Sequence, residues 1–521
     1  MPIVQQGTVN TTALIVPDLY VQIVAPQNLV LNGVPTNLIG VVGSAVWGAV
    51  NQPVVVGSMT DYAQCFGAIQ TRKYDMGTAV AIAVQQGAQA FSCVRVTDGT
   101  DIAAEITYQP TGTTASLVIT ALYTGSFGSQ ITVTLQPGTQ VGSYRLVVAA
   151  PGVYPEVFDN ITGSGAALWS ALAAAVNSGA GVARGASQLV TMTAPGGAAA
   201  FTAGVVLPLY GGSDGAAGVT ATTLVGQDVL PRRGMYALRG QGCSICVLAD
   251  ADSSAEWVTQ AAFGLSEGVY MILAGPAGDM ISDAVSVKAT SGLDSYASKL
   301  MFGDWVWWQD QVNGVTRLVS PQGFVAGRLG NLSPEQSTLN KQIYGVVGTQ
   351  KSSSPGSAQA ATYAAADLAE LFGAGIDVIA NPQPGGSFWG VRGGYNSSSN
   401  ASINGDNYTT MTNYLAATLN AGMGAYVGQL INNTLFQQIR ATVMSFLQNL
   451  LTQGVLGQVG TTAPFSVVCD TSNNPLSRTS LGYVQCDVQV QYQAINQKFI
   501  VNLEGGQTVT IQTQTLPSGQ V

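Results

Sequence analysis

Apolar runs that alternate with helical stretches constrain the fold of this chain more than any other feature. The runs LIGVVG, AFSCVRV, CSICVL and YMILAG are apolar almost throughout, which is typical of strands buried on both faces. Helices are predicted between such runs, for example from about Asp75 to Gln86, closed by Gly87. The alternation predicts an α/β fold built on a parallel or mixed sheet.

A β-rich stretch interrupts this alternation, so we expect several domains. After Thr97 the sequence turns to Gly, Thr, Ser and Ala, with alternating runs such as SQITVTL and YRLVVAA. The chain has 521 residues, which is too long for one core. The predicted fold class is therefore α/β with mixed α+β parts and several domains. The expected divisions are an N-terminal arm (1–16), the first part of a core (17–96), a β-rich insertion (97–228), an α/β middle domain of subtilisin-like topology (229–380), the second part of the core (381–505) and a C-terminal arm (506–521).

Both ends of the chain are predicted to be extended strands. The first sixteen residues mix Gln, Thr and Asn with short β-branched runs, and QTVTIQTQT near the other end alternates between β-branched and polar residues. Neither end has an evident partner in the chain, so each is suited to pair with another molecule. The predicted inter-subunit strand residues are Thr12, Ala13, Leu14, Ile15 and Val16, and Thr508, Val509, Thr510, Ile511, Gln512 and Thr513.

Charged residues are scarce. They make up 9% of the chain, against about 25% in ordinary soluble proteins. Charge is depleted where surfaces are buried against partners, so we expect extensive contacts with other subunits. The net charge of -9 argues against direct nucleic-acid binding. No signal peptide and no 18-residue apolar span are apparent, so we expect no direct membrane contact and synthesis in a cytoplasm.

The longest amphipathic helix is predicted from Thr434 to about Gln453. Thr434 and Gln437 form a capping-box pattern at its start, and Gly454 ends it. Its apolar seam consists of Leu435, Ile439, Val443, Phe446 and Leu450. The polar face consists of Gln438, Arg440, Ser445, Gln448 and Asn449.

Two of the six cysteines lie in successive strand-like runs. Cys469 ends PFSVVC and Cys486 lies in YVQCDVQVQYQ, and the two runs are predicted to pair as a hairpin. A disulfide between them, formed after cell lysis, is a hypothesis. Cys243 and Cys246 form a CxxC inside a strand-like run instead of at a helix start, so we interpret them as buried thiols.

No set of residues predicts catalysis. GGSDG around Ser213 matches the nucleophile pattern GxSxG, which leaves an α/β serine hydrolase as an alternative. The chain contains no histidine, so a Ser-His-Asp triad is excluded, and the motif favours a tight turn. There is no phosphate-binding loop, dinucleotide fingerprint or zinc pattern. We therefore predict a non-enzymatic protein without cofactor or metal.

An ordered series of segments resembles the contractile phage tail sheath family. In the first part of the chain they are PDLYVQI (17–23), NGVPTNLIGVVGSAVWGAVNQPVVV (32–56), GTAVAIAVQQGAQAFSCVRV (77–96), ALYTGSFGSQITVTL (121–135) and LYGGSDG (209–215). In the second part they are PQGFVAG (321–327), GIDVIA (375–380), SFWGVRG (387–393), the helix at 433–456, FSVVCDTSNNP (465–475) and DVQVQYQAINQKFIVNL (487–503).

The resemblance implies a structural subunit of a contractile tail. Such a chain would have a conserved core built from its N- and C-terminal segments, and would polymerise as stacked hexameric rings around a tail tube. Its arms would add strands to neighbouring subunits, and the helix at 433–456 would face the tube. The tail tube, baseplate and neck or terminator proteins are the implied partners. The expected location is the tail of a virion assembled in a bacterial cytoplasm, and a headless bacteriocin or another contractile injection system is the alternative.

Overall fold

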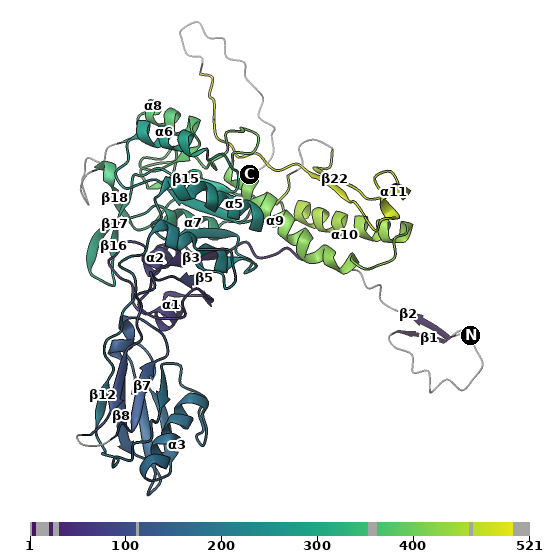
Figure 1. The fold of residues 1–521 in the computed structure, drawn as a ribbon. Helices are drawn as coiled ribbons and strands as arrows, with labels where there is room; N and C mark the ends of the chain where they lie inside the picture. Colours follow the sequence, from purple (N-terminus) through teal and green to yellow (C-terminus); the bar gives the residue numbers. More distant parts are fainter. Residues whose placement is uncertain are drawn as a thin grey trace, which may run out of the picture.

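The computed structural model of the chain contains three packed units (Figure 1). It describes residues 3–6, 20–23, 31–110, 114–352, 362–457 and 462–503. An α/β unit lies at the centre, a β-rich unit projects from one side of it, and a C-terminal unit of helices and a hairpin projects from another. The predicted arm strands, residues 12–16 and 508–513, lie outside the described residues.

A seven-stranded sheet with the order β19-β15-β14-β13-β3-β5-β4 forms the α/β unit. Neighbouring strands pair in parallel, except that β4 runs antiparallel to β5 at one edge. The apolar runs therefore predicted the sheet correctly. Its strands are β3 (Leu38–Gly43), β4 (Pro53–Val56), β5 (Ala90–Arg95), β13 (Ile245–Leu248), β14 (Tyr270–Ala274), β15 (Ser298–Met301) and β19 (Ile376–Asp377).

Helices cover both faces of this sheet because its central strands are apolar on both sides. In β13, Ile245 and Val247 belong to the core on one face, and Cys246 and Leu248 belong to the core on the other. The first face is covered by α1 (Met59–Phe66), α2 (Met76–Gln85) and α7 (Gln322–Gly330). The second is covered by α4 (Ala221–Val225), α5 (Trp257–Glu267), α6 (Ile281–Ser291) and α8 (Ala365–Gly373).

Strands from residues 17–96 and from residues 229–380 lie in this one sheet. Strand β13 pairs directly with β3, with Ile245 opposite Ile39. When β3, β5, β13, β14, β15 and β19 are numbered one to six, their spatial order is 2-1-3-4-5-6. This is a doubly wound order. With the antiparallel β4 counted as well, the seven strands have the order 2-3-1-4-5-6-7. The subtilisin-like topology expected for residues 229–380 stays a prediction. Pairing between distant strands leaves no local sequence pattern, so the sequence did not predict it.

The β-rich unit packs two antiparallel sheets and one helix around its own core. The sheet orders are β10-β9-β8-β12 and β11-β7-β6. Trp169 of α3 is completely buried in this core. The elements are β6 (Glu105–Tyr108), β7 (Leu117–Ala121), β8 (Thr132–Pro137), β9 (Tyr144–Ala149), β10 (Glu156–Ile161), α3 (Gly165–Ser178), β11 (Val190–Thr193) and β12 (Val206–Pro208).

The C-terminal unit consists of two long helices and a β-hairpin. These are α9 (Asp406–Met423), α10 (Asn433–Thr452), β22 (Phe465–Val468) and β23 (Asp487–Val490), with the short α11 (Leu476–Thr479) in the hairpin connection. Leu31 packs with Leu415 and Leu447 in the core of this unit. A residue that precedes the large sheet thus joins an apolar cluster near the other end of the chain.

Smaller elements complete the described fold. The remaining strands are β1 (Ile3–Gln6) and β2 (Tyr20–Ile23), β16 (Val306–Asp310), β17 (Val315–Val319) and β18 (Val346–Thr349), and β20 (Ile379–Ala380) and β21 (Gly390–Val391), which form three separate sheets. Short 3-10 helices are η2 (Ser126–Gln130), η3 (Gly234–Leu238), η4 (Ser254–Glu256), η5 (Gln350–Ser352) and η6 (Gly424–Tyr426).

Candidate assembly interface

The N-cap of helix α10 lies two residues before the predicted cap, Thr434. Asn432 is its N-cap, and the side-chain oxygen of Asn432 accepts a hydrogen bond of 2.8 Å from the backbone N–H of Leu435. The predicted capping box at Thr434 and Gln437 is therefore wrong, and Thr434 lies exposed in the first turn. Asn caps as well as Thr does, and the extended backbone of Asn432 (φ -155°) aims its side chain at the free N–H groups.

The two faces of α10 are divided as the sequence predicts. The five residues of the apolar seam are all buried against α9 or the hairpin. The five polar residues Gln438, Arg440, Ser445, Gln448 and Asn449 are all exposed. Arg440 is the only charged residue in α10. The helix therefore offers solvent a long, amide-rich and nearly uncharged face.

Strands β22 and β23 form the predicted hairpin and lie against α10. They pair antiparallel, with Val467 opposite Val488, and these inner side chains pack in the core of the C-terminal unit. Cys469 and Cys486 follow at the connection end of the hairpin, and both are free thiols. The sheet has only these two strands among the described residues, so each keeps one unpaired edge. We call this pair of strands the acceptor sheet.

The chain leaves the acceptor sheet as an extended segment that ends in exposed apolar residues. Gln493 is held by Asn407, whose side-chain amide donates to its carbonyl over 2.9 Å, and Tyr395 donates to Gln497 over 3.1 Å. Beyond these contacts the segment is unprotected: Phe499, Ile500, Val501 and Leu503 are 82%, 80%, 68% and 91% exposed. The sequence shows the run FIVNL (499–503), but it does not show that these side chains are exposed.

The described part of the N-terminal arm has a partner inside the chain. Strand β1 pairs in parallel with β2, with Ile3 opposite Tyr20. The expectation that the first sixteen residues lack an intrachain partner therefore does not hold for residues 3–6. Residues 7–19 separate the two strands in sequence, which is as long as the connection of about a dozen residues that a parallel pair requires.

A buried ionic cluster fixes the C-terminal unit to the large sheet. The ammonium group of Lys299, on β15, lies 2.6 Å from the carboxylate of Asp377 and 2.9 Å from that of Asp406, the first residue of α9. All three side chains have no exposed surface. The hydroxyl groups of Tyr270 and Thr338 also donate to Asp406. The sequence shows these residues far apart and gave no sign that they meet.

Each ionised group in this cluster is supported by its partners. Burial acts to lower the pKa of Lys299, but the charges of Asp377 and Asp406 outweigh it and the pKa is raised. Burial acts to raise the pKa of Asp406, but the charge of Lys299 and the hydroxyl donors bring it below its usual range. Lys299 and Asp406 therefore stay ionised at neutral pH.

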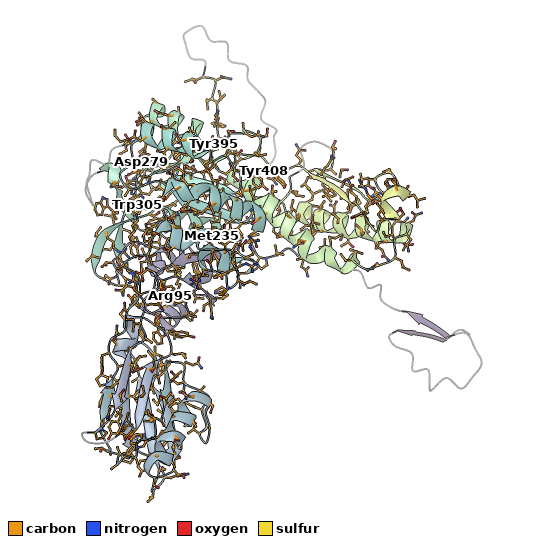
Figure 2. The ribbon with its side chains drawn as sticks, viewed as in Figure 1. Arg95, Met235, Asp279, Trp305, Tyr395 and Tyr408 are labelled. Carbon is orange, nitrogen blue, oxygen red and sulfur yellow. The ribbon has the colours of Figure 1, made fainter. Side chains whose placement is uncertain are left out.

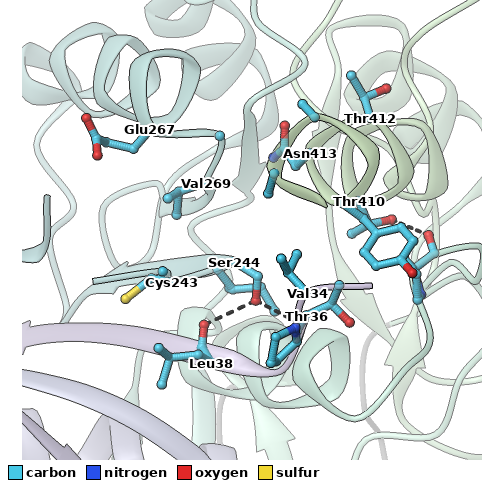
Figure 3. A pocket seen from close by; sticks show the side chains of 18 of the residues that line it. Val34, Thr36, Leu38, Cys243, Ser244, Glu267, Val269, Thr410, Thr412 and Asn413 are labelled. Carbon is cyan, nitrogen blue, oxygen red and sulfur yellow. Dashed lines mark hydrogen bonds between the residues drawn. The ribbon is translucent and has the colours of Figure 1, made fainter. Parts of the chain in front are cut away.

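A cavity of about 760 Å³ lies between α9 and the large sheet (Figure 3). The hydroxyl of Ser244 donates to the carbonyl oxygens of Thr36 and Leu38 at its floor, over 2.6 and 3.1 Å. Of its described lining residues only Glu267 is charged. The cavity lies at the amino ends of the parallel strands, whereas ligands of such sheets bind beyond the carboxyl ends. Its described lining holds no pair of charged groups for acid–base chemistry.

Solved structures match this fold, although no model of a known protein family and no curated protein matches the sequence. A sheath tail protein of Listeria innocua matches with a TM-score of 0.59 and 14% identity, over 85% of this chain and 90% of that one. A sheath tail protein of Desulfitobacterium hafniense gives 0.56 and 16%, over 87% and 93%. The contracted PVC sheath, from an extracellular contractile injection system, gives 0.56 and 10%, over 95% and 98%.

The chain has the fold of contractile sheath proteins. The fold class expected from the resemblance is thereby confirmed. The matching proteins are described as sheath components. Nearly the full length of the sheath fold is present, because the chain covers at least 90% of each of these structures.

In this sheath fold the GGSDG motif joins two units. The carboxylate of Asp214 accepts hydrogen bonds from Arg72, over 2.6 Å, and from the backbone N–H of Ser126, over 2.7 Å. The buried guanidinium of Arg95 donates to the carbonyl of Asp214 over 3.2 Å. Figure 2 shows Arg95 where the β-rich unit meets the α/β unit. Ser213 sits in a β-bridge of this joint, in a chain without histidine, so the hydrolase alternative has no histidine base.

In the described parts of the sheath fold, no group of three or more His, Cys, Asp or Glu residues could hold a metal ion. No helix among the described residues is long and apolar enough to cross a membrane.

Proposed function

We propose that the chain is a structural subunit of a contractile tail sheath and links to copies of itself by strand exchange. The observation that carries this proposal is the acceptor sheet, whose two edges are unpaired in the described chain, beside a C-terminal segment whose apolar residues 499–503 are uncovered. Two free edges suit two incoming arms, residues 12–16 and 508–513. Such β-augmentation depends on main-chain hydrogen bonds, so the links can persist while subunits reorient.

The proposed assembly is a stack of hexameric rings around a tail tube, capped by baseplate and neck or terminator proteins. Contraction would drive the tube through the host envelope during genome ejection. The sheath would belong to the virion tail, after assembly in a bacterial cytoplasm. The likeness to the contracted PVC sheath and to a chain of the anti-feeding prophage (AFP) baseplate structure supports polymerisation and baseplate contact.

A sheath of a headless bacteriocin or of another contractile injection system is the second candidate. The match to the PVC sheath over 95% of this chain favours it. Purified particles distinguish the two candidates. DNA-filled heads attached to the sheath identify a phage tail, and particles that never carry a head identify an injection system.

Truncation tests the strand exchange. A chain that ends at residue 503 lacks the predicted strand 508–513, and one that ends at 514 keeps it. We expect the first to stay folded, by circular dichroism, but to form no striated tubes or polysheaths in electron micrographs, and the second to polymerise. Normal tubes from the chain ending at 503 would refute the exchange of the C-terminal strand.

The exposed face of α10 is the proposed tube contact. Ser445→Glu with Gln448→Glu adds two charges to a nearly neutral face, which must then be desolvated against the tube. We expect at least a tenfold loss of co-sedimentation with the tail tube and unchanged self-polymerisation. Ser286→Glu with Thr290→Glu, at two exposed positions of α6, is the matched control. Equal tube binding by both variants would place the tube contact elsewhere.

A further inference from the structure

Cys469 and Cys486 lie directly opposite each other at the closed end of the acceptor sheet. The last paired residues of the two strands are Val468 and Asp487, so the next pair in register is Cys469 with Cys486. The two thiols are within hydrogen-bonding reach of each other. Cys469 is 1% exposed, and Cys486 is only partly buried.

The hydrogen-bond pattern determines which kind of pair this is. The N–H of Gln491 donates to the opposing carbonyl of Pro464, over 2.7 Å, which marks a hydrogen-bonded pair. Pairs alternate along an antiparallel ladder, so the cysteines occupy a non-hydrogen-bonded pair. The Cα atoms of such pairs lie about 4.5 Å apart, which is within the range that a disulfide spans. Both sulfur atoms also face the α10 side, where Cys469 and Cys486 pack with Ile439.

The connection between the cysteines is already held together without a covalent bond. The side-chain amide of Asn473 donates to the carbonyls of Val468 and Gln485, over 2.8 and 3.3 Å, and so bridges the two strands. Asn474 accepts from the N–H of Gln485 over 2.6 Å. The native arrangement thus keeps the two thiols opposed, so a disulfide needs no rearrangement of the hairpin.

We propose that Cys469 and Cys486 are an oxidative modification site, at which an intrachain disulfide closes the loop of residues 470–485 and locks the acceptor sheet. The oxidant is a small disulfide such as oxidised glutathione. The more accessible Cys486 attacks it and releases one glutathione thiol; Cys469 then attacks the mixed disulfide and releases the second. The two thiol protons leave with the two released glutathione molecules, so the exchange balances.

Oxidation at this site is conditional. Burial raises the pKa of the Cys469 thiol. Burial and the neighbouring Cys469 raise the pKa of the Cys486 thiol to about 12. Little thiolate is therefore present at neutral pH, so exchange is slow there and becomes faster as the pH rises. The site rests on the geometry of the hairpin and does not depend on the proposed sheath function.

Trypsin tests the disulfide in the full-length chain because Arg478 lies inside the loop and is half-exposed. The chain is treated with oxidised glutathione, cleaved, and compared with and without reductant. We expect the fragments on either side of Arg478 to stay joined until reductant is added, and the linked Cys469 and Cys486 peptides to have lost two hydrogen atoms in mass. Fragments that separate without reductant, or chains linked to one another, would overturn the proposal.

Three variants control this experiment. Cys469→Ser and Cys486→Ser should each abolish the joined fragments, whereas Cys65→Ser, which removes a partly buried cysteine on α1, should leave them joined. The wild-type chain gives a second readout that does not depend on a variant folding. Iodoacetamide added under denaturant after oxidation should label two fewer cysteines than after reduction. Loss of the joined fragments in Cys65→Ser would likewise overturn the assignment.

Discussion

Lys299 has no exposed surface, and its ammonium group is shared by the carboxylates of Asp377 and Asp406. The three residues come from β15, β19 and the first turn of α9, so one cation holds the C-terminal unit on the sheet. A buried pair of this kind contributes little compared with an apolar replacement of the whole cluster. Loss of one member of the cluster, however, leaves the charges of the other members buried without a counter-charge.

Lys299→Met is expected to lower the free energy of unfolding by about 3 to 5 kcal/mol, because two carboxylates then remain buried without their cation. Urea unfolding of the two chains measures the difference. Lys341→Met is the control, since the ammonium of Lys341 forms no ion pair with any described residue, and it should change stability by less than about 0.5 kcal/mol. Equal effects of the two substitutions on the free energy of unfolding would mean that the buried cluster does not depend on Lys299 for its stability.

The contribution of Asp75 to the stability of the fold depends on pH. Its buried carboxylate caps α2 by accepting the N–H of Thr78 over 2.9 Å, and burial raises its pKa to about 6. Folding therefore favours the protonated carboxyl group of Asp75. The stability that this group contributes below about pH 4 is lost as the pH rises through about 6.

Asp75→Asn keeps an acceptor for the N-cap and removes the charge. We expect it to raise the free energy of unfolding by about 2 to 3 kcal/mol at pH 8 and hardly at all at pH 4. Asp75→Ala, which loses the cap as well, should be less stable than Asp75→Asn at both pH values. A variant Asp75→Asn that is less stable than the wild type at pH 8 would contradict this account.

At the scale of single elements, the N-terminus of α10 is stabilised by its N-cap, Asn432. Asn432→Ala should cost about 1 kcal/mol, because the N–H of Leu435 loses its acceptor. Thr434→Ala should be neutral within about 0.5 kcal/mol, since Thr434 is exposed and does not cap. Thermal unfolding of the two variants decides between the caps. A larger loss for Thr434→Ala would restore the capping box predicted from the sequence.

Local sequence patterns were sufficient to predict some of these elements. The seam of α10 and the β22–β23 hairpin were predictable because Ile439 and Val467 belong to regular apolar periods. The cap at Asn432 was missed because several capping residues stand in a row, and sequence does not rank them. The pairing of β13 with β3 and the meeting of Lys299 with Asp406 were not predictable, because distant contacts leave no periodic signal. The arm strands, residues 12–16 and 508–513, stay predictions.

At the scale of the whole molecule, the joint at Arg95 determines how firmly the β-rich unit is held. The buried guanidinium of Arg95 donates to the carbonyl oxygens of Gly48, Thr124 and Asp214 over 2.8, 2.7 and 3.2 Å. The strand β5 that carries it belongs to the large sheet, and Thr124 belongs to the β-rich unit. This buried side chain therefore helps to tie the β-rich unit to the sheet, together with the Arg72–Asp214 pair, the hydrogen bond from the N–H of Phe127 to the carbonyl of Val46 and the packing of Trp47 in the core of the β-rich unit.

Arg95→Met should loosen this joint without unfolding either core. Three buried carbonyl groups lose a charged donor, at a cost of about 3 kcal/mol, and the loss falls on segments 123–126 and 211–215. We expect amide hydrogen exchange in these segments to rise at least tenfold, while exchange in β8 and β14 stays unchanged. Arg145→Met, which removes a guanidinium within the β-rich unit, should leave the joint protected. A uniform rise across both cores would show that Arg95 supports global stability instead of the junction.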